Sequence, residues 1–439
     1  MRYYKIHFSF LLVAASQLAL GADDSAKMVS LEAAKEYAVQ HNFGVLALRK
    51  EVEEVEARRG RARSKFFPTL GVAGGADTEM SSTSTSSSPL GYVYSNFNLF
   101  SGFEDIYRSE MASLEVEKAE LRLRRTEFRV GLDVERVFHQ YLFKKSSIGL
   151  KEEAIKSNES HKKMAAQKRS SGMASDSDIM EFDLKDALLN SDLLLLRQEL
   201  EESRTSLKHL LGEEIGSRIE PVGSLQHQHL KGKLMDHVKR IQTDSENVVV
   251  AVKDLAIANI QSKASRSKWL PRVDLELVAG YLPWDLRTVP GGTSMVGGKI
   301  VARFDLFSGF DTLYERREQL AKQLRLESEL KDAILDAVTE TENAYRRIAT
   351  IQARVDLEEQ NERRAKKYYA SVLSEYRRGI KNSADLRVAS DGVYDAAMKR
   401  EGFKFDFLSQ RLELERALGG PVATDTIGDG LNLNEGKTK

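Results

Sequence analysis

The sequence of 439 residues contains no cysteine, which excludes disulfide bonds, thiolate metal sites, a cysteine nucleophile and a lipid-modified N-terminal cysteine. Proline is scarce, with seven residues, and the mixture rich in Leu, Ala, Glu, Lys and Arg is typical of long helices. Neither sign of charge is in excess, because 66 basic residues balance 66 acidic ones. The chain therefore has no net positive charge that would favour binding to a nucleic acid.

Motifs of catalysis are missing as well. The eight histidines are scattered, and the closest pair, His227 and His229, lies in a predicted linker, with His237 further on. There is no Gly-rich phosphate loop and no nucleophile elbow. We therefore expect a protein that is not an enzyme and that has no cofactor and no metal site.

A long hydrophobic run occurs only at the N-terminus. Residues 1–21 combine the basic Arg2 and Lys5 with an apolar run and a small residue at the end, which is the pattern of a secretory signal peptide. No later segment reaches 18 consecutive apolar residues. If the exported chain enters a membrane, it must do so as strands.

The chain contains a duplication. Residues 97–104 (FNLFSGFE) recur 207 positions later as FDLFSGFD, and Gly172 and Asp178 recur at the same offset as Gly379 and Asp385. Such self-similarity indicates a repeated structural unit. We predict a first repeat at 22–212, a linker at 213–230, a second repeat at 231–419 and a disordered tail at 420–439.

Each repeat is predicted to hold an opening helix, two strands, a long helix and a return helix. The opening helices are expected at 30–64 and 234–268, and the long helices at 103–170 and 310–378, where about 68 residues would span about 100 Å. The lengths of a return helix and an opening helix add up to about the length of one long helix. This match predicts that each return helix stacks end to end on the opening helix of the other repeat, which gives four antiparallel columns.

The predicted strands have the pattern of a membrane wall. They are expected at 68–77 and 90–100 and at the matching positions of the second repeat, where apolar residues alternate with charged ones along 272–277. A hairpin in a soluble sheet is the alternative, but strands of about 10–11 residues fit a bilayer. Aromatic residues that could form an interfacial girdle collect at the strand bases: Phe67, Phe100, Trp269 and Phe307.

Four membrane strands cannot stand alone. Open edges in hydrocarbon leave backbone groups unpaired, and four strands are too few to close a barrel. Several chains must therefore share one barrel, with the helical columns wrapped into a tube by cyclic symmetry. The fold class is thus mainly α, with tandem long antiparallel helices and four β-strands per chain that contribute to a membrane β-barrel.

The tandem arrangement, with a Pro before each strand pair, Leu-Phe-Ser-Gly-Phe before each long helix and Leu-Gly after each return helix, resembles the TolC family of outer-membrane efflux and type I secretion channels. The resemblance implies a homotrimer with a twelve-strand barrel in the outer-membrane lipid and a helical tunnel in the periplasm. It also implies docking to a periplasmic adaptor and an inner-membrane transporter. Substrates would pass from the periplasmic tip to the exterior.

The helical breaks are the candidate sites. The resemblance assigns Asp178, Tyr376 and Lys381 to contacts that close the periplasmic tip, and Asp385 to an acidic constriction ring. The second acid of that ring is replaced here by Val388. Ser175 and Asn382 precede these acids by three residues, the spacing of a capping box. Gly172 and Gly379 are expected to allow the chain to reverse and to mark where an adaptor touches.

Two alternatives remain at this stage. A periplasmic adaptor also has long hairpin helices, but it would show one hairpin flanked by β-rich modules. A soluble coiled-coil scaffold would explain the helices but neither the signal peptide nor the amphipathic strands. A channel would be released from outer-membrane fractions only by detergent, and this behaviour would distinguish it from both alternatives.

Overall fold

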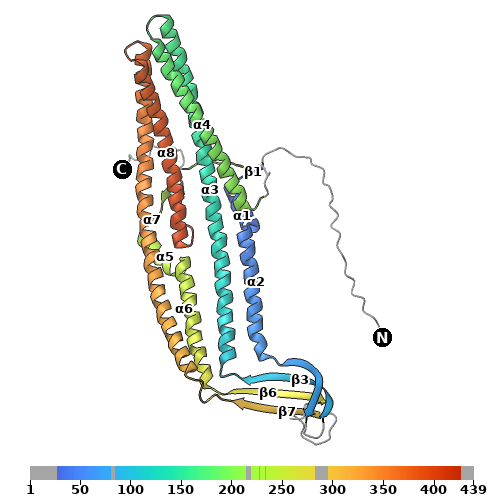
Figure 1. The fold of residues 1–439 in the computed structure, drawn as a ribbon. Helices are drawn as coiled ribbons and strands as arrows, with labels where there is room; N and C mark the ends of the chain where they lie inside the picture. The colour runs from blue at the N-terminus through green and yellow to red at the C-terminus, as the bar shows by residue number, and fades with distance from the viewer. Residues whose placement is uncertain are drawn as a thin grey trace, which may run out of the picture.

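The computed structural model describes residues 27–80, 85–213, 219–226, 228–232, 234–281 and 295–426. The molecule is elongated, with helices running along one axis and a four-stranded sheet at one end (Figure 1). The signal peptide expected at 1–21 lies outside the described residues. Among those residues, we find no helix that combines the length and the apolar character needed to span a bilayer.

The helices follow the same order in both halves of the chain. They are α1 (Leu31–His41), α2 (Phe43–Arg63), α3 (Glu104–Ser170), α4 (Asp176–Leu211), α5 (Leu234–Asp244), α6 (Glu246–Ala264), α7 (Asp311–Arg377) and α8 (Ser383–Leu418), with 3-10 turns η1 (Ser64–Phe66) and η2 (Ser265–Trp269). The long helices α3 and α7 each contain 67 residues, which corresponds to about 100 Å.

The strands form three sheets. They are β1 (Lys27–Val29), β2 (Thr69–Met80), β3 (Thr85–Phe100), β4 (Ile219–Pro221), β5 (Gln228–Leu230), β6 (Arg272–Tyr281), β7 (Met295–Arg303) and β8 (Thr424–Thr426). The main sheet is antiparallel in the order β2-β3-β6-β7, while β1 pairs with β4 and β5 pairs with β8.

The first hairpin of the main sheet is longer than predicted. β2 has 12 residues and β3 has 16, because the Thr- and Ser-containing segment before Leu90 also pairs as strand. In the second hairpin β7 stops at Arg303, although the alternation continues to Leu306. Arg303 pairs with Arg272, the first residue of β6, and the preceding Pro271 has no N–H to continue the ladder.

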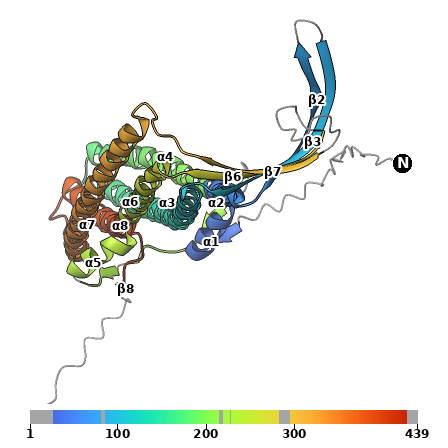
Figure 2. The ribbon, with the colours of Figure 1, turned by 90° about the horizontal axis from the view of Figure 1, so that it is seen from below.

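The register of the main sheet puts most of its apolar residues on one face, while Val278 and Val301 lie on the other face with the charged side chains. Cross-strand pairs such as Val72 with Val93 and Leu275 with Ile300 lie on the apolar face, as the alternation predicted. No helix lies over either face of the sheet in the two views, and the described apolar side chains are open, with Val72 80% and Ile300 67% exposed (Figures 1 and 2).

Each opening helix is broken, contrary to the prediction of one continuous helix. Asn42 has extended backbone angles, and its side-chain oxygen accepts hydrogen bonds from the N–H groups of Gly44 and Val45, so a new helix starts there. Ser245 makes the equivalent break between α5 and α6. Hydrophobic periodicity continues across both breaks, which hid them in the sequence.

The return helices stack on the opening helices of their own repeat, so the predicted stacking across repeats is wrong. The side chain of Asn42 donates a hydrogen bond of 2.9 Å to the carbonyl of Leu210 at the end of α4. A Cβ atom on Gly212 would lie 2.7 Å from the carbonyl oxygen of His41. In the second repeat Gly419 contacts Asp244, the last residue of α5, in the same way, so α8 ends where α6 begins and α6 continues the column (Figure 1).

The end of the chain is ordered further than predicted. The expectation of disorder from residue 420 is wrong up to residue 426, because β8 pairs with β5 and Val422 is buried. The N–H of Val422 also donates to Glu415 at 3.1 Å. The predicted linker at 213–230 contains two short strands, β4 and β5. Residues 427–439 lie outside the described part of the chain.

The main core lies at mid-height, where α1, α3, α4, α7 and α8 meet the short strands. Phe138 and Tyr141 of α3, Leu207 of α4 and Phe407 of α8 are all buried there. Burying such side chains stabilises the fold by roughly 1.5–3 kcal/mol each. A smaller cluster around Tyr376 and Leu386 lies near the tip.

Candidate functional site

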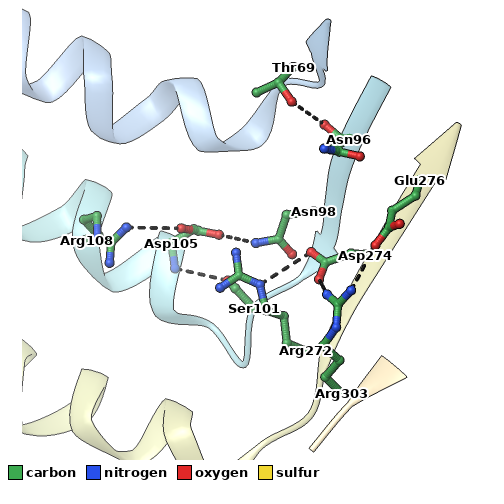
Figure 3. A network of polar contacts seen from close by, with 10 residues as sticks. All are labelled: Thr69, Asn96, Asn98, Ser101, Asp105, Arg108, Arg272, Asp274, Glu276 and Arg303. Carbon is green, nitrogen blue, oxygen red and sulfur yellow. Dashed lines mark hydrogen bonds and ion pairs between the residues drawn. The ribbon is translucent and has the colours of Figure 1, made fainter. Parts of the chain in front are cut away.

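The polar face of the main sheet carries a cluster of charges beside the helices, drawn in Figure 3 except for Lys299. We call it the charged belt, and its members are Arg272, Asp274, Glu276, Lys299 and Arg303. Arg303 donates to Asp274 at 2.8 Å and to Glu276 at 2.9 Å. Lys299 lies 3.1 Å from Glu276, and Arg272 lies 3.4 Å from Asp274. Each carboxylate therefore has two cationic partners.

A second set of contacts fixes the sheet to the start of α3 (Figure 3). The side chain of Asn98 donates to Asp105 at 2.7 Å, and the Ser101 hydroxyl accepts from the Asp105 N–H at 3.2 Å. Asp105 is buried, and Arg108 lies 3.9 Å from its other oxygen. The strand-to-helix turn is thereby held in one geometry.

The four predicted girdle aromatics lie at the junction of sheet and helices. Phe67, Trp269 and Phe307 are 68%, 56% and 73% exposed. Sequence reasoning missed two more aromatic residues, Phe103 and Phe310, which have positive φ angles of 70° and 67°. Phe103 packs edge-on against Phe100, and Phe310 packs in the same way against Phe307, with ring centroids 5.2 and 5.3 Å apart.

At the opposite end, Gly172 and Gly379 begin the reversals of the chain. Both have positive φ, 71° and 82°, and a Cβ atom on either would meet open space. The capping boxes expected at Ser175–Asp178 and Asn382–Asp385 are both present. Each acid thus stabilises the N-terminus of a return helix.

Asp178, the acidic residue at the first tip, also interacts with a residue of the second repeat. Asp178 accepts hydrogen bonds of 2.8 Å from the N–H and the hydroxyl of Ser175, and it interacts with the hydroxyl of Ser383. These bonds lower the pKa of Asp178 below its usual value, with the Ser175 backbone as the largest cause. Lys381 lies 3.6 Å from Asp385 on its own hairpin.

Tyr376 lies at the same end, where its charged partner is Lys168. It is buried, and its hydroxyl has no hydrogen-bond partner among the described residues. The Lys168 ammonium lies 3.9 Å from the ring centroid and donates to the Tyr376 carbonyl. Lys168 is 208 positions away in the sequence, and no local signal marked it.

Three further contacts, all missed in the sequence, join the two helical hairpins. His161 and the Tyr369 hydroxyl are 2.7 Å apart, Lys185 and Asp391 are 2.7 Å apart, and Arg387 and Glu181 are 2.5 Å apart. We call this set, with the Lys168–Tyr376 contact, the hairpin seam. His161 is 2% exposed, and burial lowers its pKa to about 4.

A buried charge cluster crosses the middle of the molecule. Glu135 of α3 contacts Lys35 at 2.9 Å and also Arg411 of α8. Burial alone would raise the pKa of Glu135, but Arg411 and Lys35 hold it below its usual value. Beside it, burial lowers the pKa of His139 to about 4.

His229 of the predicted linker and His237 of α5 have a scaffold that the sequence did not reveal. His229 lies on β5 and contacts Gln352 of α7, and the ring of His237 packs against Tyr345 at 5.9 Å. His227 lies outside the described residues. Within the described ranges, no three His, Asp or Glu side chains are grouped so as to hold a metal ion.

Comparison with known proteins gives a family and a set of structural neighbours. A family model described as outer membrane efflux protein matches residues 36–213 and 238–420. The outer membrane protein VceC of Vibrio cholerae has a TM-score of 0.76 at 15% identity, covering 89% of this chain and 96% of that one. The MtrE outer membrane channel of Neisseria gonorrhoeae, in its open state, has a TM-score of 0.76 at 16% identity, with 89% of each chain covered. CmeC of Campylobacter jejuni gives 0.77 at 14% identity, covering 89% of this chain and 86% of that one. No curated protein matches the sequence.

Proposed function

The chain belongs to the outer membrane efflux protein family, and from this premise we propose that three copies close one twelve-strand barrel continued by a helical tunnel. The protein is an outer-membrane efflux channel whose helices lie in the periplasm. The family is one of channels rather than enzymes. The comparisons give no support to the alternatives of a periplasmic adaptor or scaffold.

One observation carries the proposal: a sheet with an uncovered apolar face ends in two edge strands, β2 and β7. An isolated sheet of this kind would expose unpaired backbone groups in lipid at several kcal/mol each. Pairing β2 of one copy with β7 of the next removes both edges. The apolar face then contacts lipid, and the face with the charged belt lines the lumen.

Within the assembly, the two repeats, 22–212 and 231–419, each supply two strands and two helical columns. Phe67, Phe100, Trp269 and Phe307, joined by Phe103 and Phe310, form the girdle at the periplasmic membrane boundary. The tips at Gly172 and Gly379 dock a periplasmic adaptor that couples the channel to an inner-membrane transporter. The open space around these glycines supports such a contact.

The same tips hold the gate. We assign closure to Asp178, Tyr376, Lys381 and Asp385, with the contacts described above as the restraints. Asp178 interacts with Ser383, and the Lys168 ammonium lies over the Tyr376 ring, so these contacts hold hairpins from different repeats together. An adaptor that separates the hairpins would open the tunnel.

The natural absence of cysteine allows a direct test of barrel closure. Leu70→Cys on β2 is combined in turn with Val296→Cys, Gly298→Cys and Ile300→Cys on β7, all on the apolar face. Closely paired strands bring Cα atoms within disulfide range. Dimer and trimer bands on non-reducing gels of oxidised outer membranes are expected for at least one pair. The single variant Leu70→Cys is the control, and monomers throughout the series would contradict closure.

A further inference from the structure

The end of α2 and the η1 turn carry a run of basic side chains where the chain enters the sheet (Figure 1). The run consists of Arg59, Arg61, Arg63 and Lys65, and we call it the basic patch. Residues 57–69 contain no Asp or Glu. Three of the four side chains are exposed, and Arg59 is half-buried. Among the described residues, none of the four forms an ion pair, so no direct partner neutralises their charge.

Helix α3 covers only one side of this segment. Val55 of α2 packs with Val116 and Ala119 of α3. Ala62 follows Val55 by seven residues and is also buried, so it lies on the same face of α2. The residues before and after Ala62 are rotated about 100° to either side of this face. The basic patch is therefore not covered by α3.

The basic patch is adjacent to aromatic residues at the base of the sheet. Phe66 and Phe67 directly follow Lys65 and are 43% and 68% exposed. Phe66 follows Arg61 by five residues, which corresponds to about 8 Å along a helix. The headgroup layer on each side of a bilayer is about 5–8 Å thick. With the aromatic girdle at the membrane boundary, the basic patch lies at the level of the lipid headgroups.

Positive charge is in excess even when all the junctions of sheet and helices are counted. Residues 57–69, 101–112, 262–271 and 304–320 contain eleven basic and seven acidic side chains, an excess of four positive charges per chain. The first two segments, from the first repeat, account for three of the four. In the second repeat, Lys268 pairs with Asp311 at 3.1 Å and with Glu315 at 2.7 Å. The count includes the start of α7, so the next copy in the barrel does not remove the excess.

We propose that the basic patch binds the headgroups of anionic phospholipids, such as phosphatidylglycerol, in the periplasmic leaflet of the outer membrane. The guanidinium groups donate paired hydrogen bonds to a phosphate, and Lys65 adds a point charge. The exposed aromatic side chains of the girdle lie at the same interface and contact the lipids there. The surface rests on the proposed function, because only the barrel places the girdle at a membrane boundary.

The test measures lipid binding beside the basic patch by fluorescence quenching. The chain contains two tryptophans. Trp269→Phe and Trp284→Phe combined with Phe67→Trp leave one fluorescent reporter, two residues after Lys65. The protein is placed in phosphatidylcholine vesicles with a minor fraction of dibrominated phosphatidylglycerol or dibrominated phosphatidylcholine. We expect the anionic lipid to bind about fivefold more strongly, the factor that one basic residue contributes near an anionic surface.

Variants in the reporter protein assign this preference to the basic patch. Changing all four residues to Gln (Arg59→Gln, Arg61→Gln, Arg63→Gln and Lys65→Gln) should bring the ratio of the two binding constants close to one. Changing the three arginines to Lys keeps the charges and should keep most of the preference. Lys50→Gln is the matched control, because Lys50 is exposed on α2 but lies about 22 Å from Lys65 along the helix. It should leave the ratio unchanged.

Four outcomes would contradict these proposals. Equal binding of the two lipids, or an unchanged ratio in the Gln variant, would overturn the basic patch as a lipid site. Loss of trimers in the Gln variant alone would assign the patch to the contact with the next copy, and sedimentation with peptidoglycan without a lipid preference would assign it to that polymer. Either result would also overturn the proposal. No quenching by either brominated lipid would contradict the proposed function instead, because the reporter would not lie at a membrane.

Discussion

The ammonium of Lys168 lies 3.9 Å from the ring centroid of Tyr376, and the two residues belong to different repeats. Lys168 also donates a hydrogen bond to the Tyr376 carbonyl. Because the tyrosine is buried at the tip, this contact fixes the end of α7 against the end of α3. In the proposed gate, Lys168 would therefore restrain opening through its charge as well as its packing.

Lys168→Met should loosen the tip. The variant keeps an apolar stem over the ring but loses the cation–π contact, which contributes about 1 kcal/mol in partly buried settings, and the hydrogen bond to the carbonyl. Single-channel recordings should show a higher mean conductance or more frequent openings than the natural protein. Lys163→Met, an exposed change on the same helix, is the control. Identical traces for the natural protein and Lys168→Met would remove this residue from the gate.

Acid should destabilise the folded protein between pH 6.5 and about 4. Burial lowers the pKa of both His139 and His161 to about 4, whereas an unfolded histidine titrates near 6.5. Between these values the unfolded chain binds protons that the folded chain does not, so stability is highest above pH 6.5 and falls on acidification. Each histidine accounts for about 2–3 kcal/mol of this change.

His161→Gln retains a hydrogen-bonding group opposite Tyr369 but cannot titrate, so its Tm should fall less between pH 7.5 and pH 4.5 than that of the natural protein. His139 still titrates in this variant and accounts for the remaining dependence. His209→Gln, at an exposed position near the end of α4, should behave like the natural protein. Parallel Tm curves for all three proteins would contradict a role for His161.

Gly419→Ala should be among the most destabilising single changes in the chain. Gly419 has a φ of +67°, and an added Cβ would lie 2.0 Å from the carbonyl oxygen of Asp244. Strain and separation of α8 from α5 should cost about 2 kcal/mol or more. Gly392→Ala in the middle of α8 meets open space and should instead stabilise the helix by up to about 1 kcal/mol. Thermal unfolding of the two variants tests this prediction. Equal Tm values for Gly419→Ala and Gly392→Ala would contradict close stacking of α8 on the end of α5.

Val388→Asp should strengthen the acidic constriction expected at Asp385. Val388 is 58% exposed and lies three residues along α8 from Asp385, so the two side chains share one helix face. Three copies would then present six carboxylates at the entrance, and block by a trivalent cation should tighten roughly tenfold, about 1.4 kcal/mol. Val388→Asn controls for size and polarity. Unaltered cation block would show that Asp385 does not line the constriction.

The long elements of the fold could be predicted from the sequence because their boundaries have strong local signals. Helix α3 begins after Gly102–Phe103 and ends before Gly172, and its predicted bounds differ from the structure by one residue at the start. The stacking of the columns could not be deduced from lengths, since pairing within a repeat and pairing across repeats give the same total. The Asn42 side chain, which donates to Leu210, decides between them.

The sequence predicted where the candidate gate lies but not which residues contact one another there. Tyr376 and Asp178 are both at the tip, yet their partners, Lys168 and Ser383, come from the other repeat. Contacts between residues some 200 positions apart carry no periodic signal. The same limit hid His161 and Tyr369.

The pairing of β8 with β5 determines where a fused protein would emerge. β8 ends at residue 426 beside the middle of α7, because its partner strand β5 carries His229, which contacts Gln352 of that helix. A reporter inserted directly after residue 426 would start from this level, between the sheet and the tips. Neither the sheet nor the tips would be beside the point of insertion, so such a fusion could label working channels in cells.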